Sequence, residues 1–304
     1  MPMANEYHAP VLLHDCVEGL NIRPDGIYVD ATFGGGGHSR AILEKLGPKG
    51  RLIAFDRDAD AASNMPDDPR FTLVRSDFRW LKNHLRYLNA LPVQGLLADL
   101  GVSSHQFDVG ERGFSFRSDG PLDMRMDQRN PVSAADLIAR SDVRTLTDII
   151  RRYGEVQRPD RVAHQLVKAR EERPITTTRE LVGALGPFLH GKGENSFLAQ
   201  VFQAFRIAVN DELGSLGTLL QVSAEVIAPG GRLVIISYHS LEDRLVKRWM
   251  RTGNIEGRET KDVFGNVQRP FRPVNKKATQ PSMEEVARNP RARSAKARIA
   301  ERTE

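Results

Sequence analysis

Four consecutive glycines, Gly34 to Gly37, follow an apolar run that ends in Asp30 and precede a helical pattern over residues 40–46. Glycine has no Cβ, so such a turn lets the backbone approach a ligand closely at the carboxyl end of a strand, where open α/β sheets bind nucleotides. The pattern therefore predicts either a tight structural turn or a site for a flat, adenosine-like ligand.

The next apolar run, residues 51–55, leads to Asp56, which lies 26 residues after Asp30. An acid about 20 residues after such a turn commonly binds the ribose of an adenosine cofactor, although it can also be a solvated residue at a strand end. The dinucleotide fingerprint is incomplete, because Ser39 or Arg40 stands where its third glycine is needed, and the phosphate-binding Lys is absent. We therefore expect S-adenosylmethionine, which carries no polyphosphate.

Short apolar runs alternate with helical patterns, as expected of a parallel, doubly wound sheet. The predicted strands are residues 27–30, 51–55, 71–75, 93–99 and 233–236. Residues 112–206 show only helical stretches broken by prolines. The sequence thus predicts an α/β fold in which residues 1–111 and 207–304 form a Rossmann-like sheet domain and residues 112–206 form an inserted helical domain.

Composition excludes several other classes of protein. No run approaches the ~18 apolar residues of a membrane helix, and the N-terminus lacks a signal sequence, so we expect a cytoplasmic protein that does not bind membranes. Cys16 is the single cysteine, which excludes an intramolecular disulfide and a cysteine-cluster zinc site. We expect no metal.

Positive charge is concentrated near the C-terminus. Residues 265–304 carry ten Lys and Arg against four Glu, whereas the net charge of the whole chain is +5. Such a segment can bind the phosphates of a nucleic acid, or it can simply keep a terminus soluble. We favour nucleic-acid binding. Arginines over residues 151–173 make the helical domain a second candidate RNA surface, although interleaved acids also fit solvated helix faces.

Eight motifs spread along the chain resemble those of the RsmH (MraW) family of bacterial methyltransferases. They are HAPVLL (residues 8–13), DATFGGGGHS (30–39), DLGVSS (99–104), RGFSF (112–116), GPLDMRMD (120–127), FQAFR (202–206), SLEDR (240–244) and NPRARS (289–294). The resemblance implies a Rossmann-like class I methyltransferase sheet with an inserted helical domain. It also implies S-adenosylmethionine-dependent methylation of the exocyclic N4 of a cytidine in 16S, small-subunit ribosomal RNA. Ribosomal RNA or the ribosomal subunit would be the partner, and the choice between a monomer and a homodimer stays open.

The resemblance further implies a set of cofactor contacts. They are Gly36, Gly37, His38, Asp56, Phe78, Asp99 and Gln106. Backbone groups of the turn would hold the amino-acid end of the cofactor, and Asp56 the ribose. Phe78 would pack on the adenine or simply fill the core. Asp99 would meet the cofactor ammonium or the target amine, and Gln106 would supply an amide to the same end of the ligand.

The chemistry of an exocyclic amine requires positioning and charge stabilisation rather than a covalent adduct. Methylation of pyrimidine carbon 5 would need a thiol nucleophile, and we expect Cys16 to lie away from the strand ends. Asp99 and His239 are the candidate catalytic residues, and His239 would contact the target base or serve the structure. Related amino-methyltransferases usually carry an acid, Asn or Ser before Pro-Pro at this strand end, where this chain has Asp99-Leu100-Gly101.

That departure leaves the aromatic residue that would stack on the target base unassigned among Phe114, Phe116 and Tyr238. The family usually has Phe at the position of Tyr238, so we expect Tyr238 to pack. Charges in the loop 123–127 either order a lid over the cleft or pair with one another.

Three other functions share some of these features. A nicotinamide-dependent oxidoreductase would share the sheet but requires the missing third glycine. A non-catalytic RNA-binding assembly factor would share the basic C-terminal segment. A methyltransferase of the same fold that acts on another RNA or on a protein would share the cofactor and differ in its acceptor.

Overall fold

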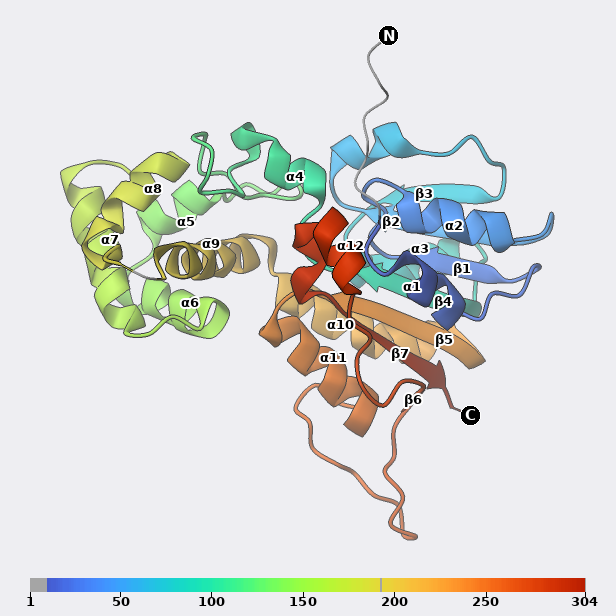
Figure 1. Ribbon diagram of the computed structural model, residues 1–304. Coiled ribbons are helices and arrows are strands. Elements are labelled where there is room, and N and C mark those ends of the chain that lie inside the picture. Colours follow the sequence, from blue (N-terminus) through green and yellow to red (C-terminus); the bar gives the residue numbers. More distant parts are fainter. Residues whose placement is uncertain (1–9, 192, 304) are drawn as a thin grey trace. The chain divides into compact units, whose positions relative to one another are not determined.

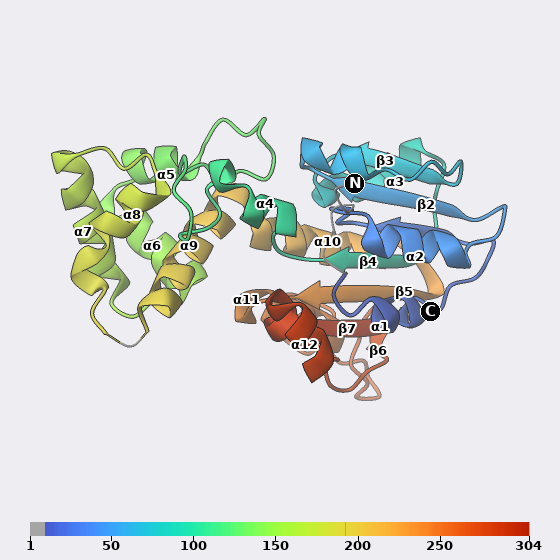
Figure 2. The ribbon, with the colours of Figure 1, turned by 45° about the horizontal axis from the view of Figure 1, so that its top comes forward.

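Seven strands form one sheet in the computed structural model, which describes residues 10–191 and 193–303. The strands are β1 (Ile27–Asp30), β2 (Arg51–Asp56), β3 (Phe71–Arg75), β4 (Val93–Asp99), β5 (Ile227–Ser237), β6 (Phe271–Pro273) and β7 (Lys296–Arg302). Their order is β3-β2-β1-β4-β5-β7-β6, which Figure 2 shows from β3 at the top. The first five strands are parallel, and β7 runs antiparallel to β5 and β6. The predicted parallel sheet is confirmed.

Helices cover both faces of the sheet because successive strand residues point to opposite sides. On one face Val29 and Ile53 pack against α3 (Leu81–Tyr87), α10 (Glu212–Val226) and α11 (Ser240–Thr252). On the other face Tyr28 and Leu52 pack against α1 (Leu13–Gly19) and α2 (Gly37–Lys45). Both faces are buried, which explains why these strands read as continuous apolar runs.

The basic C-terminal segment contains secondary structure that the sequence did not predict. It forms β6, α12 (Met283–Arg288), a 3₁₀ turn (Pro290–Ser294) and β7. Ala300 packs in one core cluster and Ile299 in the other, on opposite faces of β7. Residues 296–302 of the basic segment therefore complete the sheet, which the charge pattern did not indicate.

Two compact units are present, and they divide the chain after Gly101 and after Glu212. The sheet unit comprises Met1–Gly101 and Leu213–Glu304, and the helical unit comprises Val102–Glu212. Residues 102–111 and 207–212, assigned to the sheet domain from the sequence, fall in the helical unit. Phe107 and Val209 pack on the helical core, which accounts for this difference.

The helical unit is built from amphipathic helices that enclose their own core (Figure 1). The helices are α4 (Ser104–Asp108), α5 (Ala134–Arg140), α6 (Val143–Gly154), α7 (Pro159–Glu172), α8 (Thr178–Ala184) and α9 (Glu194–Asn210). Ser and Thr caps start α5 and α8, because their side chains accept the N–H groups left unpaired at a helix start. No helix of the described residues is long and apolar enough to cross a membrane.

Candidate functional site

Three acids end three parallel strands of the sheet unit: Asp30 ends β1, Asp56 ends β2 and Asp99 ends β4. Asp30 pairs in register with Ala54 and Leu97, so the three strands end at the same edge of the sheet. This edge is where open α/β sheets bind their ligands.

The glycine turn lies at this edge between β1 and α2. Gly34 and Gly36 have φ values of +49° and +74°, which L-residues rarely adopt. A Cβ on Gly36 would lie 2.9 Å from Phe33, and one on Gly37 would lie 2.7 Å from Pro10. By contrast, no atom of the described residues lies within 4 Å of a Cβ placed on Gly34. The turn is therefore tightly packed at Gly36 and Gly37 and has open space beside Gly34.

Asp56 is hydrogen-bonded to this turn. Its carboxylate accepts the N–H of Gly34 and the N–H of Asp58, both at 2.8 Å. Burial raises the pKa of Asp56, against the lowering effect of these two hydrogen bonds. Each carboxylate oxygen accepts one backbone N–H and keeps capacity for a second donor. Asp56 can thus orient the turn and bind a hydroxyl at the same time.

Asp99 is held from two sides. Its backbone N–H donates to Thr32 Oγ1 at 2.6 Å, and its Oδ1 accepts the Tyr238 hydroxyl at 2.8 Å. Burial raises the pKa of Asp99 to about 7, and the charges of Asp30 and Glu242 act in the same direction. The side chain keeps 22% of its surface exposed. Asp99 is therefore a positioned acid that exchanges its proton near neutral pH.

His38 faces Asp99 with its side chain, although the sequence suggested only a backbone role. Its Nε2 lies 3.1 Å from the Val11 carbonyl oxygen, and its Nδ1 lies 3.8 Å from Asp99 Oδ2. Burial lowers the pKa of His38 to about 4, so the ring is neutral at pH 7. A carbonyl oxygen only accepts, so Nε2 carries the proton and Nδ1 faces Asp99 as an acceptor.

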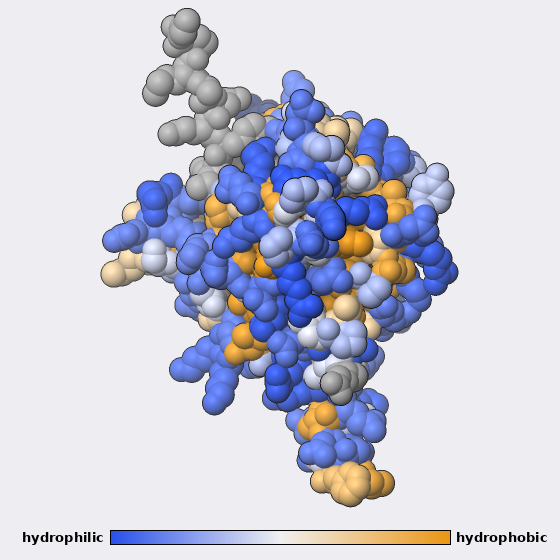
Figure 3. Space-filling model, turned by 90° about the vertical axis from the view of Figure 1, so that its right-hand side faces the viewer, coloured by the Kyte–Doolittle hydropathy of each residue, from blue (hydrophilic) through white to orange (hydrophobic). Residues whose placement is uncertain are grey.

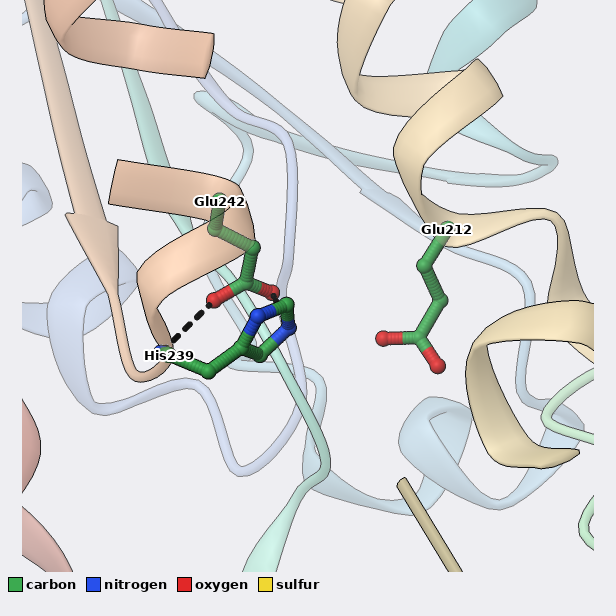
Figure 4. A group of neighbouring side chains, drawn as sticks. All are labelled: Glu212, His239 and Glu242. Carbon is green, nitrogen blue, oxygen red and sulfur yellow. Dashed lines mark hydrogen bonds and ion pairs between the residues drawn. The ribbon is translucent and has the colours of Figure 1, made fainter. Parts of the chain in front are cut away.

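His239 precedes α11 and pairs with an acid of that helix (Figure 4). Its Nε2 lies 3.2 Å from Glu242 Oε1, and Glu242 Oε2 accepts the backbone N–H of Tyr238 at 2.9 Å. The His239 ring nitrogens are both buried. Among the described residues neither ring nitrogen has a hydrogen-bond partner, so the contact of His239 with a target base stays a prediction beside its structural interpretation. An acid three residues into a helix is a known capping signal, which could have identified Glu242 from the sequence.

Phe78 begins a short 3₁₀ turn after β3 and is partly buried against the core. The preceding Asp77 accepts the N–H of Arg79 at 2.9 Å and forms ion pairs with Arg57 and Arg79. Ser215 donates to the same carboxylate at 3.1 Å. No sequence pattern indicates this cluster, because Ser215 lies 138 residues after Asp77 in the chain.

Gln106 and two of the three candidate stacking aromatics lie in the helical unit. Gln106 is buried, and its side-chain oxygen accepts the Ser103 N–H at the start of α4. Phe114 belongs to the helical core, and Phe116 packs on Phe202 with ring centroids 5.6 Å apart. Their roles toward a ligand stay predictions.

The charges of the loop 123–127 pair within the loop and with its neighbours. Asp123 pairs with Arg125 at 2.7 Å, and Asp127 pairs with Arg129 at 2.8 Å. Of the two expectations for this loop, mutual pairing is the one observed.

Cys16 belongs to a buried apolar cluster against which Tyr238 packs. Burial raises the pKa of its thiol, and the charge of Asp99 acts in the same direction. The thiol is fully buried on α1. Burial therefore prevents Cys16 from acting as a thiolate nucleophile.

Known proteins resemble this chain in sequence over nearly its whole length. The model of the "MraW methylase family" matches residues 5–303. A protein of Parabacteroides distasonis named "Ribosomal RNA small subunit methyltransferase H" is 57% identical over 297 residues, which are 97% of both chains. A protein of the same name from Amoebophilus asiaticus is 52% identical over 99% of this chain and 97% of its own. Among solved structures, an rRNA methylase from Streptococcus thermophilus is 13% identical, with a TM-score of 0.40 over 96% of this chain and 94% of that one.

Proposed function

Because the chain belongs to the MraW methylase family, we propose that it transfers a methyl group from S-adenosylmethionine to the exocyclic N4 of a cytidine in 16S, small-subunit ribosomal RNA. The family model covers nearly the whole chain, and relatives named as small-subunit ribosomal RNA methyltransferases are more than half identical to it. These names favour ribosomal RNA over another RNA or a protein as the acceptor. A cytoplasmic location follows from this substrate.

The residues at the sheet edge fit such a cofactor. The tightly packed Gly36 and Gly37 bring backbone N–H groups and the start of α2 to the edge, which suits the carboxylate of the amino-acid end. We assign the ribose hydroxyls to Asp56, the adenine to Phe78, and the ammonium end to His38, Asp99 and Gln106. S-adenosylmethionine, when bound, supplies the electrophilic sulfonium methyl group.

The largely buried carboxyl of Asp99 is the observation that carries the proposed mechanism. The lone pair of an exocyclic cytosine amine is delocalised into the ring, so the enzyme must orient the amine and accept its protons. A carboxylate held by Tyr238 with a pKa of about 7 can accept a hydrogen bond from the amine and then its proton. Burial also raises the pKa of the Tyr238 hydroxyl, which therefore stays protonated and keeps Asp99 in place.

Methylation of small-subunit particles from a strain that lacks the enzyme tests this function. Mass spectrometry of the digested nucleosides should find N4-methylcytidine. Asp99→Ala should lower the rate by a factor of ~10² or more, whereas Cys16→Ala, which leaves no unpaired polar group, should retain activity. Detection of 5-methylcytidine, or a folded Cys16→Ala protein without activity, would contradict the mechanism.

A further inference from the structure

A hairpin outside the candidate site presents two exposed apolar residues at its tip. Val263 and Phe264 are 93% and 86% exposed. They belong to residues 258–269, here called the hairpin, which projects at the bottom of Figure 1 and ends in apolar atoms in Figure 3. Single exposed apolar residues are ordinary in proteins, so the order of the surrounding turn decides whether these two are significant.

The turn that carries them is held by hydrogen bonds. Asp262 Oδ1 accepts the N–H of Phe264 at 2.9 Å and the N–H of Asn266 at 2.8 Å, and the Asp262 N–H donates to the Asn266 carbonyl at 2.9 Å. Lys261 and Val267 pair across the hairpin as an antiparallel bridge. The tip is thus preorganised, so the binding of a ligand would cost little conformational entropy of the tip.

Helix α11 carries a basic face next to the hairpin. Val246, Trp249 and Met250 lie in the core, whereas Lys247, Arg248 and Arg251 are exposed at helical spacing. In the part of the chain that the structure describes, none of these three cations forms an ion pair. Their charges therefore remain available to an anionic partner.

The basic face and the hairpin form one surface. A Cβ on Gly257, at the base of the hairpin, would lie 3.0 Å from the Arg248 side chain. Arg269 Nη1 donates to the Arg251 carbonyl at 3.4 Å. The helix begins at Ser240, directly after β5, and its 13 residues extend about 20 Å. The basic face therefore lies between the start of α11, next to the candidate site, and the base of the hairpin.

We propose that Lys247, Arg248, Arg251 and the hairpin tip bind the RNA substrate, with Phe264 stacked on an unpaired base. This inference rests on the proposed function. An exposed aromatic ring at the tip of a hairpin whose base lies against these cations matches single-stranded RNA, whose bases stack on aromatic side chains and whose phosphates pair with cations. A protein partner fits less well, because stable protein interfaces bury about 800 Å² on each side, whereas this apolar tip consists of two side chains.

The first test measures the affinity of the full-length protein for small-subunit particles lacking the modification. Phe264→Ala should weaken binding about tenfold, since it removes one base–aromatic stack. Tyr87→Ala is the matched control, because Tyr87 is an 84% exposed aromatic on α3. It should bind as the wild type does, and both variants should bind S-adenosylmethionine normally.

The second test concerns charge. The triple variant Lys247→Ala, Arg248→Ala and Arg251→Ala should bind more weakly, and its log–log salt slope should fall by about 2–3. A control triple variant at the exposed residues Arg23, Lys49 and Arg86 should keep the wild-type slope. Unchanged affinity and slope in the first triple variant, together with unchanged affinity of Phe264→Ala, would overturn the proposal.

A photo-crosslinking amino acid at position 264 distinguishes the two kinds of occupant. A crosslink to ribosomal RNA supports the proposal, and a crosslink only to a ribosomal protein overturns it. If the wild-type protein methylates the particles but the variants bind them as tightly as the wild type does, only the proposed RNA-binding surface is refuted. A wild-type protein that does not methylate them refutes the proposed function, and with it the identity of this occupant.

Discussion

Burial makes Asp99 both a suitable proton acceptor and a source of instability. An ordinary aspartate has a pKa near 4, whereas that of Asp99 is raised to about 7. The native state therefore keeps the Asp99 proton over a pH range in which the unfolded chain has already lost it. The contribution of Asp99 to stability is fully present below pH ~4 and is lost as the pH rises through about 7.

Asp99→Asn should separate activity from stability. The variant cannot take the amine proton, so methylation should fall by a factor of ~10² or more. At pH 8 it should be more stable than the wild type by on the order of 2 kcal/mol, and the difference should vanish near pH 4. Urea unfolding at several pH values measures this. A variant that is less stable at pH 8 would show that the charged carboxyl is well stabilised. Wild-type activity should rise as the pH passes through 7.

Asp56 combines a structural and a binding role. Asp56→Ala removes the acceptor for the Gly34 N–H as well as the proposed ribose contact, so S-adenosylmethionine binding should weaken by roughly 1–3 kcal/mol or more. Titration calorimetry measures this, with the exposed Asp67→Ala as a control. Asp56→Asn keeps one acceptor oxygen and should lose less affinity. Unchanged affinity in Asp56→Ala would remove this residue from the cofactor site.

Strand β7 lies in a charged segment whose sequence pattern does not predict a strand. Its buried residues are small or apolar, such as Ala297, Ile299 and Ala300, while Lys296 and Arg298 between them pair with Asp243. Arg298 Nε donates to Asp243 at 2.6 Å. A count of charges over residues 265–304 therefore overestimates the charge available to RNA.

Truncation after Arg288 should unfold the sheet unit rather than affect RNA binding alone. It removes six residue pairings with β5 and uncovers apolar surface on both faces of the sheet. We expect aggregation and loss of S-adenosylmethionine binding. The matched control replaces the exposed Lys276, Lys277 and Arg293 by Ala and should fold normally. A soluble truncated protein with normal cofactor affinity would show that β7 is dispensable.

At the scale of the whole molecule, the chain buries two separate kinds of core. The sheet unit has apolar clusters on both faces of a mostly parallel sheet, and the helical unit has one cluster among its helices. The residues that carry the proposed chemistry come mainly from the sheet unit, at the ends of β1, β2, β4 and β5. Loops at such strand ends can vary in sequence without disturbing the cores.

The sequence by itself determined the parallel sheet, the helical insertion, the glycine turn and the acids that follow β1, β2 and β4. These features depend on local periodicity and turn chemistry, and the carboxyl ends of parallel strands share one edge. The tertiary structure alone decided the pairing of Asp99 with Tyr238, which lies 139 residues later, the burial of Cys16 and the place of β7. Such pairings and pKa shifts depend on long-range packing and desolvation, which a local pattern does not contain.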